Sequence, residues 1–249
     1  MHPETKETGF QYLESVSNLV YYICDNNYSD VLEINLKHLY QHNNVDTCCI
    51  APHGFIPEAK YAPTHIHYVD DFDYKYTAKF IIGDWDKIYN YENILYLDVD
   101  AIPKKDLGEI FETIQNQNDI IHGVVEKISL NNSDSYHKFS NDHYPDNTFA
   151  YNAGTFGFNI KMLNIFKDYL LFTSEIKNIA ELDQPIFNEF FNKIKLIQPT
   201  LSKFVHLYNM NDIYKDINQT SLDSASIVHF LGNAYSGKNI NIINSILTS

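Results

Sequence analysis

The sequence is poor in basic residues, and it contains no apolar run of the length that a membrane-spanning helix needs. Its 18 Lys and Arg residues stand against 32 Asp and Glu residues, which gives a formal net charge of −14 at pH 7. A surface of this sign repels a polyanion, and basic clusters for an anionic membrane are missing, so we expect neither nucleic-acid binding nor direct membrane insertion. An acidic protein can still bind a nucleotide if a divalent cation screens the phosphates, which favours a metal-assisted site.

Cysteine is also scarce. Cys24, Cys48 and Cys49 form neither a CxxC pair nor a zinc-binding spacing, and an odd number is a poor disulfide framework. We therefore expect reduced thiols, and because the first residues lack an apolar signal region, we expect a cytoplasmic protein. No internal repeat or low-complexity linker divides the sequence, so a single domain over residues 1–249, long enough to bury a sizeable core, is expected.

Strand and helix patterns alternate through the first half of the sequence. This alternation favours an α/β fold with a mostly parallel sheet and right-handed crossovers, in which ligands bind at the carboxyl ends of strands. Residues 126–148 are polar and without periodicity, which predicts a long surface loop. Strands are expected over 18–24, 47–51, 65–69, 93–99, 119–125, 155–160, 205–208 and 226–230, and helices over 28–40, 75–89, 106–115 (with Asp106 as its N-terminal cap), 162–175 and 183–193.

The segment Asn-Ile-Leu-Tyr-Leu-Asp-Val-Asp, residues 93–100, carries the strongest chemical signal. Asp98 and Asp100 are two residues apart, so in extended backbone their side chains point the same way. Two carboxylates at a strand end form a hard-oxygen site for Mg²⁺ or Mn²⁺, and without a cation they would repel each other. The alternative is an ordinary strand that runs into an acidic turn. The apolar run before Asp98 favours the metal site.

This segment resembles the DxD motif of A-type glycosyltransferases, in particular family 8, the glycogenin and bacterial galactosyltransferase group. The resemblance extends over nearly the whole chain and implies a single GT-A, Rossmann-like domain. It also implies a nucleotide-binding half at about 15–125 and a sugar and acceptor half at about 126–249. Five more segments follow the order of the family's motifs, namely 25–28, 79–85, 151–158, 182–188 and 228–232 with Lys238 after it.

The resemblance implies roles for the first two segments at the donor nucleotide. Tyr28 would stack on the uracil base, and Asp25 and Asn26 would hold the ribose. Lys79 would contact the donor and place one positive charge in an otherwise acidic site. Val99, between the two aspartates of the DxD motif, would belong to the same nucleotide site.

The later segments correspond to the sugar side of the family's site. Asn152 offers an amide for sugar hydroxyls, and Gly154 lets the backbone approach a ligand closely. Asp183 and Gln184 open a helix and would lie near the anomeric carbon. Glycogenin has a further aspartate three residues before this pair, and Ala180 stands there in this sequence, so a role that depends on that carboxylate is not implied.

The last segment would complete the metal site and bind the diphosphate. His229 corresponds to the family's third protein ligand of the metal, after Asp98 and Asp100. Gly232 and Lys238 correspond to the diphosphate-binding end of the motif, although Lys238 comes three residues late and lacks the Pro-Trp that follows it in the family.

The resemblance thus implies a metal-dependent enzyme that transfers a hexose from a UDP-sugar, with Mn²⁺ or Mg²⁺, to a glycan, protein or small-molecule acceptor. It implies retention of anomeric configuration and is compatible with a homodimer. The identity of the sugar and of the acceptor is left open.

Three other functions are weighed against this one. A haloacid-dehalogenase phosphatase also has a strand that ends in DxD, but Gly-Thr follows its second Asp, whereas Ala101-Ile102 follows here. A nucleotidyltransferase needs a Gly-rich basic loop after its first strand, where this sequence has Asp-Asn-Asn-Tyr. The third is a catalytically silent nucleotide- or glycan-binding domain, and the retained acidic residues and His229 argue against it.

Overall fold

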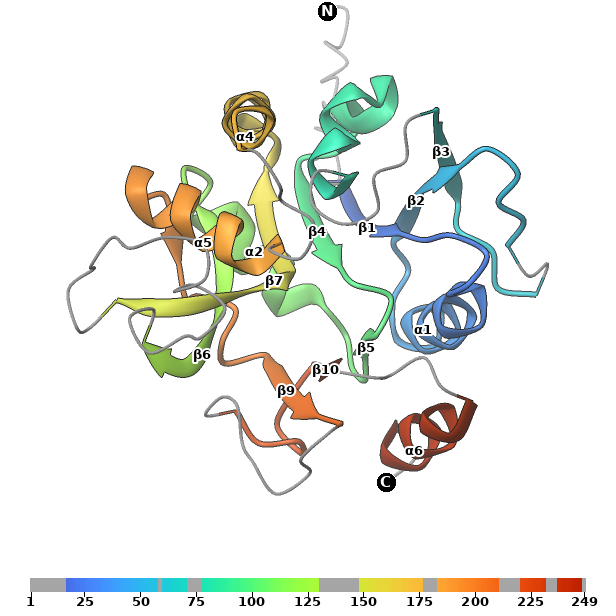
Figure 1. Cartoon of the computed structure of the whole chain (residues 1–249). Helices are drawn as coiled ribbons and strands as arrows, with labels where there is room; N and C mark the ends of the chain where they lie inside the picture. Colours follow the sequence, from blue (N-terminus) through green and yellow to red (C-terminus); the bar gives the residue numbers. More distant parts are fainter. Residues whose placement is uncertain are drawn as a thin grey trace, which may run out of the picture.

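The computed structural model describes residues 17–57, 60–70, 78–129, 148–176, 183–210, 220–231 and 237–247. Its centre is a seven-stranded sheet in the order β3-β2-β1-β4-β7-β6-β8 (Figure 1). All neighbouring strands in this sheet are parallel except those that flank β7, so the expected mostly parallel sheet is confirmed. The strands are β1 (Asn18–Ile23), β2 (Asp46–Pro52), β3 (His65–Val69), β4 (Asn93–Leu97), β6 (Ile121–Ser129), β7 (Phe149–Asn159) and β8 (Ile197–Gln198).

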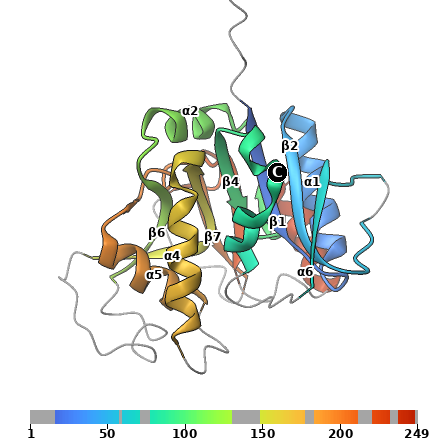
Figure 2. The ribbon, with the colours of Figure 1, turned by 90° about the horizontal axis from the view of Figure 1, so that it is seen from above.

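Helices cover both faces of the sheet, which is why its central strands are apolar throughout. Alternate residues of β1 and β4 point to opposite faces, so that Tyr21 and Tyr22 belong to different core clusters. The helices α1 (Ser29–His42) and α2 (Gly108–Asn116) cover one face. The other face is covered by α4 (Asn164–Ser174) and α5 (Asp183–Ile194), which lie side by side along the sheet (Figure 2).

A second, three-stranded sheet brings the C-terminal part of the chain to the end of β4. It has the order β5-β10-β9, with β5 (Ala101–Pro103), β10 (Ile227–Leu231) and β9 (Val205–Asn209). Because β10 pairs antiparallel with β5, His229 lies opposite Ala101, directly after the two aspartates. Helix α6 (Gly237–Leu247) packs its buried Ile243 and Leu247 against this sheet. The small sheet therefore fixes where His229 meets the DxD segment.

Two expected elements differ from the structure. The strand expected over 93–99 ends at Leu97, and the aspartates stand in a turn that Ala101 closes by donating to the carbonyl oxygen of Asp98 at 2.9 Å. The helix expected over 75–89 is instead two 3₁₀ stretches, η1 (Ala78–Asp84) and η2 (Asp86–Asn90), in its described part. Trp85 separates them because its backbone is extended, with φ −83° and ψ 111°. The apolar spacing predicts helical backbone here but does not distinguish the tighter 3₁₀ helix from an α-helix.

Other boundaries shift by several residues. The predicted loop 126–148 begins as strand, since 126–129 belong to β6, and residues 130–147 lie outside the described residues. The helix expected from Asp106 begins at Gly108, and Leu107 rather than Asp106 occupies its N-cap position. Asp106 lies one residue earlier, where its Oδ1 accepts a hydrogen bond from the Gly108 backbone at 2.8 Å. The sequence patterns missed the short strands β5 and β8 and the helix α6. Within the described residues, no helix combines the length and the apolar character that crossing a membrane requires.

Candidate active site

Three potential metal ligands, which we call the metal group, meet where β4 ends: Asp98, Asp100 and His229. Nε2 of His229 lies 3.2 Å from Oδ1 of Asp100 and 3.8 Å from Oδ2 of Asp98. One ligand atom from each residue fits within a mutual distance of 4.8 Å. The side chains of Asp100 and His229 are 7% and 3% exposed, whereas that of Asp98 is 36% exposed, so the group opens to solvent on the Asp98 side. Two carboxylates and an imidazole suit Mn²⁺ or Mg²⁺ in their donor chemistry.

The electrostatics of this group also fit a cation. Burial alone would lower the pKa of His229, but its hydrogen bond to Asp100 and the charges of Asp100, Asp98 and Glu126 raise the pKa overall. A metal ion at this position would replace the proton that the imidazole otherwise attracts. The other ring nitrogen, Nδ1, is buried and has no hydrogen-bond partner within the described part of the chain. The three residues thus form a negatively charged, largely buried group that a bound cation would stabilise.

Gly154 of β7 closes the metal group from the side of the sheet. Its carbonyl oxygen accepts a hydrogen bond from the Asp98 backbone at 2.8 Å. A Cβ atom at this position would overlap Oδ2 of Asp98 and Cε1 of His229, and it would lie 2.9 Å from Cγ of Asp98. Only glycine therefore lets β7 run this close to the two ligands, as the sequence suggested for a ligand site.

Asn35 of α1 holds the backbone of the turn that contains the two aspartates. It approaches from the face of the sheet that α1 and α2 cover. The fully buried Nδ2 donates to the carbonyl oxygens of Val99 at 3.0 Å and Ala101 at 2.8 Å, and Oδ1 accepts from Tyr22 at 2.9 Å. Sequence reasoning missed Asn35 because a single Asn within a helical pattern carries no signal of so distant a partner. The Val99 side chain is buried in the core, so only backbone atoms of this residue can face a ligand.

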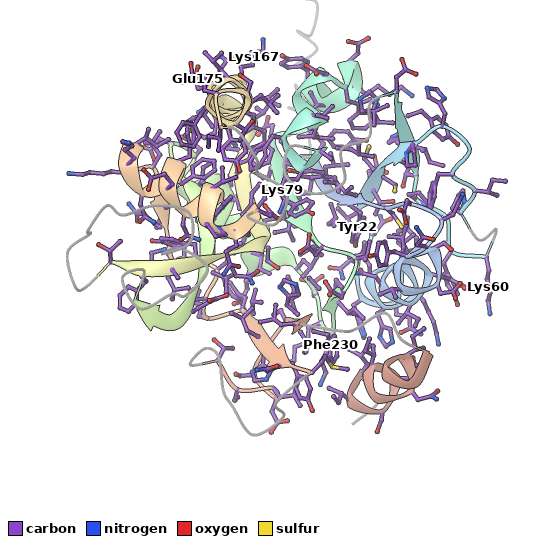
Figure 3. All side chains as sticks on the ribbon, in the orientation of Figure 1. Tyr22, Lys60, Lys79, Lys167, Glu175 and Phe230 are labelled. Atoms are coloured by element: carbon purple, nitrogen blue, oxygen red, sulfur yellow. The ribbon has the colours of Figure 1, made fainter. Side chains whose placement is uncertain are left out.

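Lys79 and Asp183 form an ion pair in which the lysine is buried and the Asp183 side chain is 32% exposed. Nζ of Lys79 lies 2.6 Å from Oδ2 of Asp183 and donates to the carbonyl oxygen of Ala153 at 3.0 Å. The Lys79 side chain is 5% exposed, and Figure 3 shows it in the interior of the molecule. Burial raises the pKa of Asp183 to about 6, against the influence of Lys79 and together with the repulsion from Asp98. The other oxygen of Asp183, Oδ1, is buried and has no partner among the described residues.

A network of amides and one carboxylate surrounds Gln184, the second residue of α5. Its Nε2 donates to Oε1 of Glu126 at 3.0 Å, and its Oε1 accepts from the Ala153 backbone at 3.3 Å and from Nδ2 of Asn152 at 3.4 Å. Burial raises the pKa of Glu126, although the hydrogen bonds from Gln184 and Asn152 and the charge of His229 oppose the rise. Sequence reasoning placed Glu126 in a loop and missed it, since no motif marks a lone carboxylate at the end of a strand.

Comparison with known proteins decides what this arrangement belongs to. The model of the family described as glycosyl transferase family 8 matches residues 78–235, a segment that runs from the start of η1 past His229. The chain belongs to glycosyl transferase family 8. It is a glycosyltransferase, and the resemblance stated from its motifs is confirmed. No curated protein matches the sequence of this family 8 enzyme at a significant level.

Solved structures similar to this family 8 enzyme confirm the GT-A fold. The galactosyltransferase LgtC, crystallised with donor and acceptor sugar analogues, aligns with TM-score 0.66 and 17% identity over 92% of this chain and 95% of its own. The glycosyltransferase GlyE of Streptococcus pneumoniae aligns with TM-score 0.58 and 16% identity over 94% and 61%. The bifunctional glycosyltransferase WbbM aligns with TM-score 0.60 and 13% identity over 95% and 53%.

The residues expected at the donor nucleotide of this family 8 enzyme follow β1, at the same edge of the sheet as the metal group. Oδ1 of Asp25 accepts from the Asn27 backbone at 2.9 Å. The Asn26 amide donates to the carbonyl oxygen of Gly54 and accepts from the Ile56 backbone, both at 3.2 Å, so it holds the loop after β2. Tyr28 is partly buried against the core, and burial, Asp25 and Asp100 raise its pKa.

The two residues expected at the diphosphate end remain predictions. Gly232 lies outside the described residues, and Lys238 stands in the first turn of α6, where its side chain is not among those described.

Proposed function

We propose that this glycosyltransferase transfers a hexose from a UDP-sugar, with Mn²⁺ or Mg²⁺ held by Asp98, Asp100 and His229. The observation that carries the proposal is the meeting of these three side chains from two distant segments, against a backbone where only glycine fits. The use of donor and acceptor sugar analogues in the LgtC crystals supports a sugar donor and a sugar-like acceptor. Family membership decides against the phosphatase and nucleotidyltransferase alternatives.

When bound, a divalent cation would stabilise the negative charge on the departing diphosphate as a Lewis acid. Lys79 adds a buried positive charge, but its closest partner is the carboxylate of Asp183. The first role of Lys79 is therefore to favour the ionised form of Asp183. Without this positive charge, burial would raise the pKa of the Asp183 carboxyl further.

Asp183 and Gln184 are the groups proposed to face the reacting sugar. An ionised Asp183 would stabilise the positive charge that develops at the anomeric carbon. Its Oδ1 makes no hydrogen bond within the described residues but is buried, so the role requires that the bound sugar reaches this oxygen. The amide of Gln184 is oriented on three sides by Glu126, Asn152 and the Ala153 backbone. Asn152 would also offer its amide to sugar hydroxyls.

The donor nucleotide is proposed to lie along the turn after β1. Tyr28 would stack on the uracil and Asp25 would reach the ribose, while Asn26 acts by holding the loop at Gly54 and Ile56. The backbone of Val99 would complete this side, and Gly232 and Lys238 would bind the diphosphate. Residues 15–125 would thus bind the nucleotide, and residues 126–249 would bind the sugar and the acceptor.

The metal assignment is tested by Asp98→Ala. We expect UDP affinity to rise on addition of Mn²⁺ in the wild type but not in this variant, as measured by isothermal titration calorimetry. Asp168→Ala, which removes an exposed carboxylate on α4, should keep the full Mn²⁺ effect. If Asp98→Ala still binds UDP with wild-type affinity in the presence of Mn²⁺, the metal site is wrong.

The role of Asp183 is tested by Asp183→Asn, which keeps a hydrogen-bond acceptor for Lys79 and removes the negative charge. Turnover of the donor should fall far more than donor affinity. An equal loss of both would count against a role at the reacting centre. The configuration of the product, read by NMR, tests retention separately. Front-face attack and a covalent intermediate both lead to retention, so this measurement does not distinguish them.

A further inference from the structure

A buried phenol stands behind the metal group. Tyr96 of β4 is 2% exposed, and its hydroxyl donates a hydrogen bond to Oδ1 of Asp98. Sequence reasoning counted Tyr96 only as part of the apolar run before the aspartates. A phenylalanine would fill the same space in that run, so the hydroxyl group has to be explained by what it contacts.

The hydrogen bond divides the two oxygens of Asp98 between two tasks. Oδ1 faces inward to Tyr96, while Oδ2 is the oxygen that lies 3.8 Å from Nε2 of His229, on the side of the metal group. A carboxylate at the end of a strand can rotate about two side-chain bonds, and a bond to one oxygen removes that freedom. Metal ligands are commonly oriented in this way by a hydrogen bond from a neighbouring side chain.

The phenol itself is held rigidly, which a positioning group requires. Its ring packs against Tyr21, with centroids 5.0 Å apart, and against Phe156, at 4.9 Å. Nζ of Lys79 lies 5.2 Å from the ring centroid. The ring of Tyr96 thus faces the Lys79 and Asp183 pair, while its hydroxyl reaches the metal ligand.

We propose that Tyr96 is a positioning residue for the metal ligand Asp98, which it restricts to binding through Oδ2 alone. The inference rests on the proposed function, since it requires that Asp98 binds a divalent cation. Because the Tyr96 hydroxyl is buried and donates to Asp98, its effect on the cation is proposed to pass through Asp98.

Tyr96→Phe tests the inference because it removes the hydroxyl and keeps the ring. With UDP present, Mn²⁺ affinity measured by electron paramagnetic resonance should fall about 10- to 100-fold, the usual effect of losing a group that orients a metal ligand. UDP affinity without Mn²⁺ should stay unchanged. Tyr91→Phe is the matched control: it removes another buried phenol oxygen, which donates to a carboxylate outside the metal group, Oδ2 of Asp46, at 2.8 Å, and should leave Mn²⁺ affinity unchanged.

The path through Asp98 is tested in the Asp98→Asn background, where Tyr96→Phe should cause no additional loss of UDP affinity measured with Mn²⁺. Wild-type Mn²⁺ affinity in Tyr96→Phe, or an equal loss in both backgrounds, would overturn the inference while leaving the metal site intact. If the wild type itself shows no Mn²⁺-dependent UDP binding, the metal site is wrong, and the inference is wrong with it. Circular dichroism of each variant separates these results from a loss of fold.

Discussion

Replacement of Gly154 by alanine should damage the metal site through a single methyl group. The strand β7 passes so close to the ligands that the new Cβ would overlap Oδ2 of Asp98 and Cε1 of His229. It would also lie 2.9 Å from Cγ of Asp98, where ordinary carbon contacts need about 3.5–4.0 Å. Asp98 would therefore have to move by roughly 0.5–1 Å, and His229 with it.

The size of the effect follows from that displacement. A misplacement of about 1 Å in a reacting or binding group can reduce the rate about 10²-fold, so we expect Gly154→Ala to weaken Mn²⁺ binding and to lower turnover by about that factor. The free energy of unfolding should fall by about 1–3 kcal/mol, as for other overpacked sites.

A matched control lies on the same strand. A Cβ at Gly157 would be 2.5 Å from Cδ1 and 3.0 Å from Cγ1 of Ile114, an apolar side chain on the face away from the ion pair of Lys79 and Asp183. Gly157→Ala should therefore lose stability but keep Mn²⁺ affinity. Calorimetric titration of Mn²⁺ in the presence of UDP, with thermal unfolding of both variants, makes the comparison. A folded Gly154→Ala protein that binds Mn²⁺ as tightly as the wild type would refute the reasoning.

Three further predictions concern groups around the ligands. Asn35→Ala leaves three buried hydrogen bonds unmade and should lower the free energy of unfolding by about 2–4 kcal/mol in urea titrations; a loss below about 1 kcal/mol would contradict its role in the turn. Glu126→Ala should reduce turnover more than UDP affinity because the Gln184 amide loses its acceptor. Glu126→Gln keeps an acceptor oxygen and should retain more turnover, and equal turnover in the two variants would argue against a role of Glu126 in positioning Gln184. The proposed role requires the ionised form of Asp183, so wild-type turnover should rise as pH increases through about 6, and this rise should be absent from the residual activity of Asp183→Asn. A wild-type profile that is flat across that range would be inconsistent with a catalytic Asp183.

The fold could be predicted well where periodicity and turn residues agree. The strands β1 to β4 and the helices α1, α2 and α5 follow from their apolar patterns to within a few residues. The pattern could not tell a 3₁₀ helix from an α-helix before Trp85, because both bury side chains three or four residues apart. Nor could it show that the chain turns at Asp98, since the turn is held by hydrogen bonds from Asn35, which is far away in sequence.

The candidate site shows the same limit more clearly. Sequence reasoning named Lys79, Asp183 and Gln184 from motifs. It could not pair Lys79 with Asp183, because the two are 104 positions apart and no spacing rule connects them. Glu126 was missed because it was expected in the polar loop 126–148, and Tyr96 because it looks like an ordinary member of an apolar strand. What they do depends on which side chains lie next to them once the sheet has formed.

The proposed enzyme needs a divalent cation at Asp98, Asp100 and His229 to activate a nucleotide-sugar. This requirement is tested most directly by incubating the purified protein with a panel of nucleotide-sugars, with Mn²⁺ or with EDTA, and following donor hydrolysis by NMR. We expect that a UDP-hexose is hydrolysed in the presence of Mn²⁺ and not with EDTA, and that the sugar is first released with the configuration it had in the donor. Hydrolysis at the same rate in EDTA, or no hydrolysis of any donor in the panel, would contradict it.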